Sequence, residues 1–74
     1  MSNLLNTRGL HCPLPVLKAR KALKGMAAGD VLTVEATDPA SMIDFQHFCN
    51  TTSHELLEHS EVDGIFTYVI RRGD

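Results

Sequence analysis

The order of its secondary-structure signals constrains the fold of this chain more than any other feature. Stretches rich in β-forming residues alternate with helical ones, and the last two β-rich stretches flank Asp63-Gly64, a two-residue hairpin signal. The expected elements are strands over 4–8 and 31–36, helices over 13–26 and 39–50, and strands over 55–62 and 65–71. The predicted order is therefore βαβαββ.

Two strand–helix–strand crossovers favour parallel pairing, and the closing hairpin adds an antiparallel partner. The sequence thus predicts an α+β fold: a two-layer α/β sandwich in which a mixed four-stranded sheet carries both helices on one face. The 74 residues are enough for one domain and too few for two, so we expect a single domain over 1–74.

Composition and charge exclude several classes of protein. No stretch approaches the roughly 20 apolar residues that span a bilayer, and the first residues lack the pattern of a signal peptide, so we expect a cytoplasmic protein. In that reducing compartment the two cysteines are expected to be free thiols. The net charge of -2 gives no overall attraction for phosphates, so no direct binding of nucleic acid is expected.

The segment Cys12-Pro13-Leu14-Pro15 places a thiol at the start of the first predicted helix. Proline suits the first turn of a helix, and Gly9 permits a sharp turn out of the preceding strand. Because Leu14 precedes a proline, the helix is expected to begin at Pro13 or at Pro15. Only about 3% of an unperturbed cysteine is ionised at neutral pH, and a helix N-terminus favours the thiolate. The sequence therefore predicts that Cys12 is the reactive residue.

The first helix has two faces of different character. Apolar residues at spacings of three and four predict a buried stripe of Val16, Ala19, Leu23 and Met26. The side expected to face solvent mixes leucines with lysines next to the thiol: Leu14, Leu17, Lys18, Lys21 and Lys24. Such a mixed patch is suited to docking an acidic partner, although isolated surface leucines and solubilising lysines are also common.

The other candidate residues favour structural roles. Cys49 shares an apolar stripe with Met42 and Phe45, which predicts a core thiol, while a Cys12–Cys49 redox pair is the sharper alternative. Asp38 is expected to cap the second helix, with Pro39 in its first position. His11 and Arg8 are possible cationic neighbours of the thiol, and the remaining histidines, His47, His54 and His59, are expected to be structural or solvated. No motif for a metal, a cofactor or a phosphate is present, and none is expected.

Taken together, several segments resemble the TusA/SirA family of small sulfur-carrier proteins. They are residues 6–15, Asp38-Pro39, Phe48-Cys49 and residues 54–56, so the resemblance covers nearly the whole chain. It implies a two-layer sandwich like the C-terminal domain of translation initiation factor three. It further implies that Cys12 carries sulfane sulfur as a persulfide, between a donor protein (a cysteine desulfurase or rhodanese) and an acceptor protein. Many members have aspartate where this chain has Asn6.

The resemblance leaves the pathway open, because members serve tRNA thiolation, molybdenum-cofactor assembly or sulfur oxidation. Within it, Gly9, Pro13 and Pro15 support the thiol, and Leu14, Leu17, Lys18 and Lys21 are the candidate docking residues. One alternative from another class is a non-catalytic module that binds RNA or protein through the lysines and the basic pair Arg71-Arg72. The other is a thiol–disulfide oxidoreductase, which predicts a Cys12–Cys49 disulfide.

Overall fold

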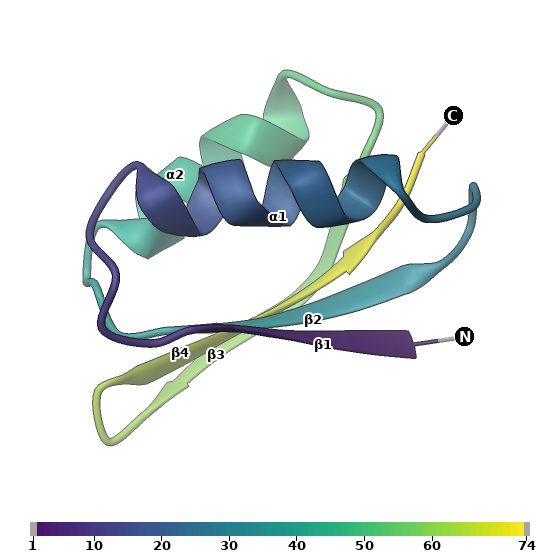
Figure 1. Ribbon diagram of the computed structural model, residues 1–74. Helices are drawn as coiled ribbons and strands as arrows, with labels where there is room; N and C mark the ends of the chain where they lie inside the picture. The colour runs from purple at the N-terminus through teal and green to yellow at the C-terminus, as the bar shows by residue number, and fades with distance from the viewer. Residues whose placement is uncertain (1, 74) are drawn as a thin grey trace.

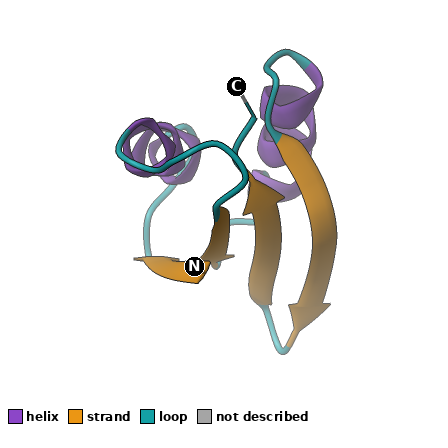
Figure 2. Ribbon diagram, turned by 90° about the vertical axis from the view of Figure 1, so that its right-hand side faces the viewer, coloured by secondary structure: helices purple, strands orange, loops and turns teal. Residues whose placement is uncertain are grey.

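The structure, a computed structural model, describes residues 2–73. Its elements are β1 (Ser2–Thr7), α1 (Leu14–Lys24), β2 (Val31–Ala36), α2 (Ser41–Asn50), β3 (Glu55–Val62) and β4 (Ile65–Arg71). Both helices cover the same face of a mixed four-stranded sheet, as Figure 1 shows. In Figure 2 the helices lie beside each other on one side of the sheet, and the opposite side is uncovered. The predicted fold class and element order are confirmed.

The strands are arranged in the order β1-β2-β4-β3. Strand β1 runs parallel to β2, as expected for two strands joined by a helical crossover, and β4 is antiparallel to both of its neighbours. The final hairpin therefore inserts β4 between β2 and β3, so the second crossover joins strands that do not pair. At the hairpin, Asp63 and Gly64 have φ values of 52° and 81°, the positive values that a type I′ turn requires.

The core lies between the helices and the sheet. Along β2 every second residue is buried, which places Leu32, Val34 and Ala36 under the helices. The Tyr68 ring on β4 stacks on Phe45 of α2, with their ring centroids 4.6 Å apart. The buried apolar residues are Ala19, Leu23, Leu32, Val34, Ala36, Phe45, Phe48, Tyr68 and Ile70. Val16 and Met26, predicted to be buried, pack against this cluster but are only partly covered.

Helix α1 begins between the two expected positions and ends earlier than expected. Pro13 occupies the N-cap position, and Leu14 is helical although it precedes a proline. At the other end, the amide groups of Gly25 and Met26 donate to Ala22 and Leu23, three residues back. These tighter bonds replace the α-helical pattern, so the helix stops at Lys24 and not at Met26.

Helix α2 begins at Ser41, two residues later than predicted. The carbonyl of Asp38 accepts the Ser41 amide at 2.9 Å, so residues 38–41 form a separate turn. The N-cap residue is Ala40, and no side chain caps the helix there. The prediction that Asp38 caps α2 with Pro39 in its first position is therefore wrong. Its carboxylate accepts the Ala40 amide within this turn and has a second partner in the site described next.

Candidate functional site

Cys12 is exposed in the loop between β1 and α1, and a carboxylate from the next crossover fixes its backbone. The Cys12 amide donates to Asp38 Oδ2 at 2.6 Å, while Asp38 Oδ1 accepts the Ala40 amide at 3.1 Å. These two hydrogen bonds lower the pKa of Asp38, and the bond from the Cys12 amide has the larger effect. The nearby His11 charge makes a smaller contribution in the same direction. The Asp38 carboxylate therefore joins the two loops while it is ionised.

A second bond joins the same loops at Gly9. The Gly9 amide donates to Thr37 Oγ1 at 2.9 Å, and its φ of 81° lies in the left-handed region that favours glycine. Figure 1 shows the β1–α1 and β2–α2 loops next to each other at one end of the molecule. Because β1 and β2 are parallel and both helices lie on one face, the loops that follow these strands leave the sheet at the same end.

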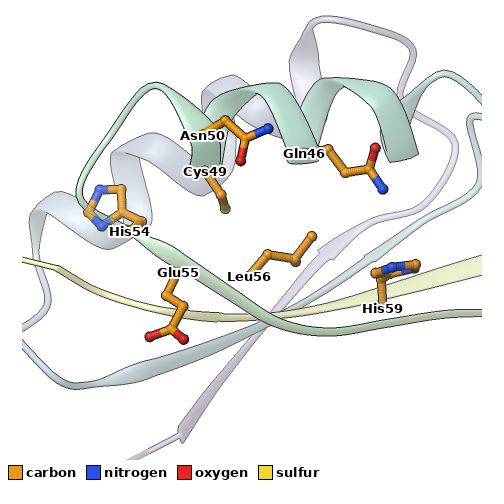
Figure 3. Close-up of a pocket in the computed structure, with 7 residues that line it drawn as sticks. All are labelled: Gln46, Cys49, Asn50, His54, Glu55, Leu56 and His59. Carbon is orange, nitrogen blue, oxygen red and sulfur yellow. The ribbon is translucent and has the colours of Figure 1, made fainter.

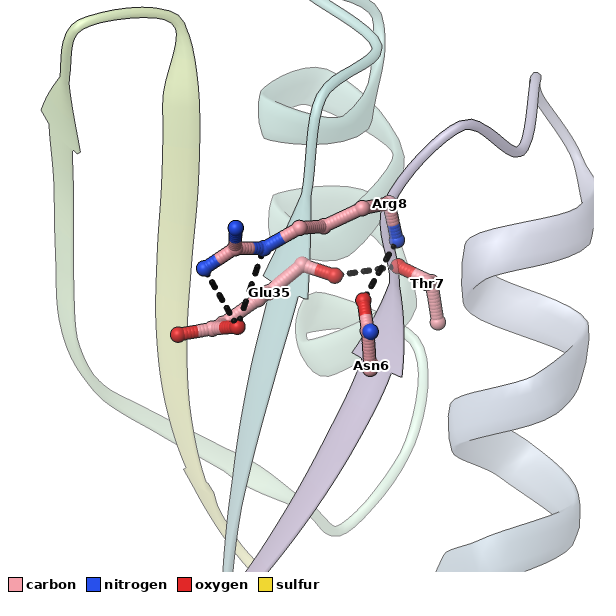
Figure 4. A network of polar contacts seen from close by, with 4 residues as sticks. All are labelled: Asn6, Thr7, Arg8 and Glu35. Carbon is pink, nitrogen blue, oxygen red and sulfur yellow. Dashed lines mark hydrogen bonds and ion pairs between the residues drawn. The ribbon is translucent and has the colours of Figure 1, made fainter.

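Polar contacts at the end of β1 hold the start of the Cys12 loop (Figure 4). The buried Thr7 hydroxyl donates to the Glu35 carbonyl at 2.6 Å, and Asn6 Oδ1 accepts the Arg8 amide at 2.9 Å. An amide oxygen is thus a sufficient acceptor at position 6, where an aspartate would offer a carboxylate oxygen. The Arg8 guanidinium, a possible cationic neighbour of the thiol, binds Glu35 Oε1 instead, with Nε at 3.1 Å.

The electrostatic environment of Cys12 differs from the expected one. A hydrogen bond to the Asp44 carboxylate raises the pKa of the Cys12 thiol, and partial desolvation and the charges of Asp44 and Asp38 act in the same direction. The Leu14 amide at the start of α1 donates to the His11 carbonyl at 2.9 Å. The direction of this shift runs against the prediction that the start of α1 favours the Cys12 thiolate, because both carboxylates oppose a negative charge on the sulfur.

The two prolines of the motif have different surroundings. Pro13 is exposed and follows Cys12 through a cis peptide bond, whereas Pro15 is fully buried and anchors the first turn of α1 in the core. The predicted docking residues all lie on the exposed side of α1: Leu14, Leu17, Lys18 and Lys21. Leu14 is 45% exposed and Leu17 50%, so an apolar surface borders the exposed thiol. A groove of about 400 Å³ also runs from Pro13 along the junction of α1 and α2.

Cys49 lies on α2 in a separate hollow of about 490 Å³. Figure 3 shows its side chain pointing from the helix toward β3, where Leu56 and His59 also line the cavity. The thiol is partly buried, and this burial raises the pKa of Cys49 to about 11. In the structure both cysteines are free, and they lie in separate places, Cys12 on an exposed loop and Cys49 in this hollow.

The histidine after α2 and the basic C-terminal pair take part in contacts within the fold. His54 Nδ1 accepts the Gly73 amide at 3.0 Å, and Arg72 Nε donates to the Leu23 carbonyl at 2.6 Å. Arg71 pairs with Glu55. Within residues 2–73 no three His, Cys, Asp or Glu side chains are grouped to hold a metal ion. No helix in that range is long and apolar enough to cross a membrane.

Comparison with known proteins places this site in a family. Residues 3–72 match the family model described as sulfurtransferase TusA. A protein of Neisseria meningitidis serogroup A, provisionally named as a sulfur carrier, is 54% identical over 70 residues, which is 95% of each chain. The sulfur carrier protein TusA of Allochromatium vinosum is 47% identical over 68 residues, covering 92% of this chain and 90% of that protein.

A solved structure shares the fold. The SirA-like protein of Desulfitobacterium hafniense superposes with a TM-score of 0.84 at 30% sequence identity, covering 97% of this chain and 99% of that one. The family match extends over both helices, all four strands and the loop that presents Cys12. The chain belongs to the TusA family of sulfur carrier proteins.

Proposed function

We propose that this protein accepts a sulfane sulfur atom on Cys12 as a persulfide and relays it from a donor protein to an acceptor protein. The observation that carries the proposal is the exposed Cys12 thiol on a loop that Asp38 and Thr37 hold in place. A relay residue has to meet two partner proteins in turn, so it must be accessible and at the same time fixed. Membership of the sulfur-carrier family supports this assignment.

The transfer is an exchange at sulfur without net oxidation. Cys12 Sγ attacks the outer sulfur of the donor's persulfide, a new S–S bond forms on Cys12, and the donor's own S–S bond breaks. The donor cysteine leaves with the bonding electron pair and takes up the proton that Cys12 loses. In the second step an acceptor thiol attacks the outer sulfur on Cys12, and Cys12 becomes a thiol again.

Loading by a small polysulfide, followed by intact mass, tests the assignment to Cys12. The expected result is the addition of one sulfur atom to the wild type, reversible by a reducing thiol, and no addition to Cys12→Ser. Cys49→Ser is the matched control because it removes the other thiol by the same substitution, and it should load like the wild type. Equal loading of Cys12→Ser and the wild type would refute the proposal.

We assign partner docking to the exposed side of α1 that follows Cys12. Leu14 and Leu17 offer apolar area there, and Lys18 and Lys21 add positive charge, which suits a donor or acceptor with an acidic surface. Lys18→Glu should slow loading from a cysteine desulfurase or rhodanese and leave loading from polysulfide unchanged. Lys24→Glu makes the same change of charge in the last turn of α1, at the end of the helix opposite to Cys12, and is the matched control. If both variants slow protein-mediated loading equally, the docking assignment is wrong.

The thiol chemistry of the relay favours one cellular location. Free thiols persist in a reducing compartment, so we place the protein in the cytoplasm. We further propose that residues 1–74 form a single domain. The acceptor belongs to one of the three pathways that the family resemblance implies: tRNA thiolation, molybdenum-cofactor assembly or sulfur oxidation. The RNA-binding alternative loses part of its support, because Arg71 and Arg72 are engaged by Glu55 and the Leu23 carbonyl.

A further inference from the structure

Strand β1 forms one edge of the sheet and lacks the protection that the other edge has. It pairs with β2 alone, without a shift in register, and its residues Ser2–Thr7 include no charge and no proline. At the opposite edge, β3 carries Glu55, Glu58 and Glu61 and a register shift after Leu56. Charges and bulges keep an edge strand from pairing with another chain. The β1 edge is therefore the one suited to accept a further strand.

A hollow of about 420 Å³ lies between β1 and α1 on the helix side of this edge. Its wall is mainly apolar and is formed by Leu5 of β1 and by Lys18, Lys21, Ala22 and Gly25 at the end of α1. The α1 residues recur at spacings of three and four, so they share one face of the helix. Figure 1 shows α1 above β1. A strand added beside β1 would direct every second side chain toward this face of α1.

The charges at the hollow fit an acidic occupant. Lys18 and Lys21 are exposed, and within residues 2–73 neither is paired with a carboxylate. A second copy of this chain fits poorly. Pairing β1 with β1 about a two-fold axis would place both α1 helices on one face of the joined sheet, and the lysines of the two copies would repel each other across the shared edge.

We propose that the groove between β1 and α1 binds an extended acidic segment of a partner protein, which adds to the four-stranded sheet as a further strand. Backbone hydrogen bonds along β1 supply affinity. An apolar side chain of the segment enters the hollow beside Leu5 and Ala22, and acidic side chains on either side of it meet Lys18 and Lys21. The inference goes beyond the proposed function, because the groove binds such a strand whether or not Cys12 carries sulfur.

Titration of the empty wild-type protein with a synthetic peptide, followed by NMR of the backbone amides, tests the proposal. The probe is a capped peptide that reads Thr-Glu-Thr-Val-Thr-Glu-Thr, so its valine and glutamates share one side of a strand. The amide signals of Leu5, Ala22 and Gly25 should shift, and that of Leu56, in the hollow around Cys49, should not. Replacing both glutamates by lysine should remove the shifts. No shift at the groove, or shifts only elsewhere, would overturn the proposal.

Backbone methylation of the peptide separates strand addition from attraction between charges alone. One peptide is N-methylated on its threonines, and a second is N-methylated on its valine and glutamates. In an added strand, alternate residues direct their N–H groups toward β1 and away from it. One methylated peptide should therefore lose binding, and the other should bind like the unmodified peptide. Equal binding of the two would contradict strand addition.

Charge reversal on α1 tests the part of the two lysines. Combining Lys18→Glu with Lys21→Glu should weaken binding of the acidic peptide about tenfold or more, because each substitution replaces an attraction by a repulsion. The same variant should bind the lysine peptide, which also shows that it is folded. Combining Arg20→Glu with Lys24→Glu is the matched control, since it makes the same change of net charge outside the hollow. Equal weakening by both combinations would refute the charge match.

Two further measurements separate this inference from its alternatives. Sedimentation of the peptide-free protein should show a monomer, and a dimer that the peptide dissociates would assign the β1 edge to a second copy and overturn the proposal. Cys12→Ser should bind the peptide like the wild type. Failure of sulfur loading would therefore leave the peptide test valid, and failure of peptide binding would leave the loading test valid.

Discussion

The Tyr68 hydroxyl supports the start of α2, and its removal should destabilise the fold measurably. The side chains of Tyr68 and Ser41 are completely or almost completely buried, and their hydroxyl oxygens lie 2.7 Å apart. Tyr68→Phe keeps the ring stacked on Phe45 but leaves the Ser41 hydroxyl buried without its partner. A buried polar group that loses its partner costs about 1–3 kcal/mol. For a domain of this size, each kcal/mol lowers the midpoint of thermal unfolding by about 4–8 °C.

A double-mutant cycle separates this bond from other effects of the substitution. Ser41→Ala removes the opposite partner and should also destabilise, because it leaves the Tyr68 hydroxyl unpaired. The combination of Ser41→Ala with Tyr68→Phe removes both polar groups together, so its cost should be smaller than the sum of the two single costs. Urea unfolding of the four proteins gives the free energies. Strictly additive costs would refute the claim that these two hydroxyls stabilise each other.

Three further results are expected. Gly9→Ala places an alanine in the left-handed region and should lower the free energy of unfolding in urea by about 1–2 kcal/mol. Gly25→Ala is the control, because Gly25 has a φ of -87° that alanine adopts readily. Equal losses in the two variants would contradict the backbone argument. Because the pKa of Asp38 is lowered in the folded state, the stability that its carboxylate contributes is present above its unfolded pKa and is lost as pH falls through its folded pKa. Between pH 7 and acid, the midpoint of thermal unfolding should therefore fall less for Asp38→Asn than for the wild type. An equal fall in both proteins would refute this contribution of Asp38. Iodoacetamide should modify Cys12 faster than Cys49 at neutral pH, since burial raises the pKa of Cys49 to about 11; faster modification of Cys49 would be inconsistent with this burial.

The fold was predictable from the sequence because its signals are local. The Asp63-Gly64 turn needs positive φ at both positions, and the alternation in β2 places every second residue in the core. The start of α2 was not predictable in the same way. Asp38 and Pro39 form a typical helix start, but the Asp38 carboxylate also binds the Cys12 amide, which lies 26 residues away in the chain. That long-range bond accompanies a separate turn before the helix.

The exposed position of Cys12 agrees with its sequence context, but its electrostatic surroundings were missed. The motif suggested only the favourable end of α1, since the nearby residues carry no acidic group. Parallel pairing of β1 and β2 brings the two crossover loops to one end of the sheet, and that topology was a signal that Asp38 lies near the thiol. The influence of Asp44 on the thiol has no comparable signal in the sequence. It depends on the position of α2 over the sheet, which the packing of Phe45 on Tyr68 helps to set.

The central claim is that a single sulfur atom is carried on Cys12, and its most direct measurement locates that atom in the wild-type protein. After incubation with a persulfide donor, the free persulfides are capped by alkylation and the protein is mapped by peptide mass spectrometry. The account predicts the extra sulfur on the peptide that contains Cys12 and none on the peptide that contains Cys49. Extra sulfur on Cys49 alone, or equally on both cysteines, would contradict it.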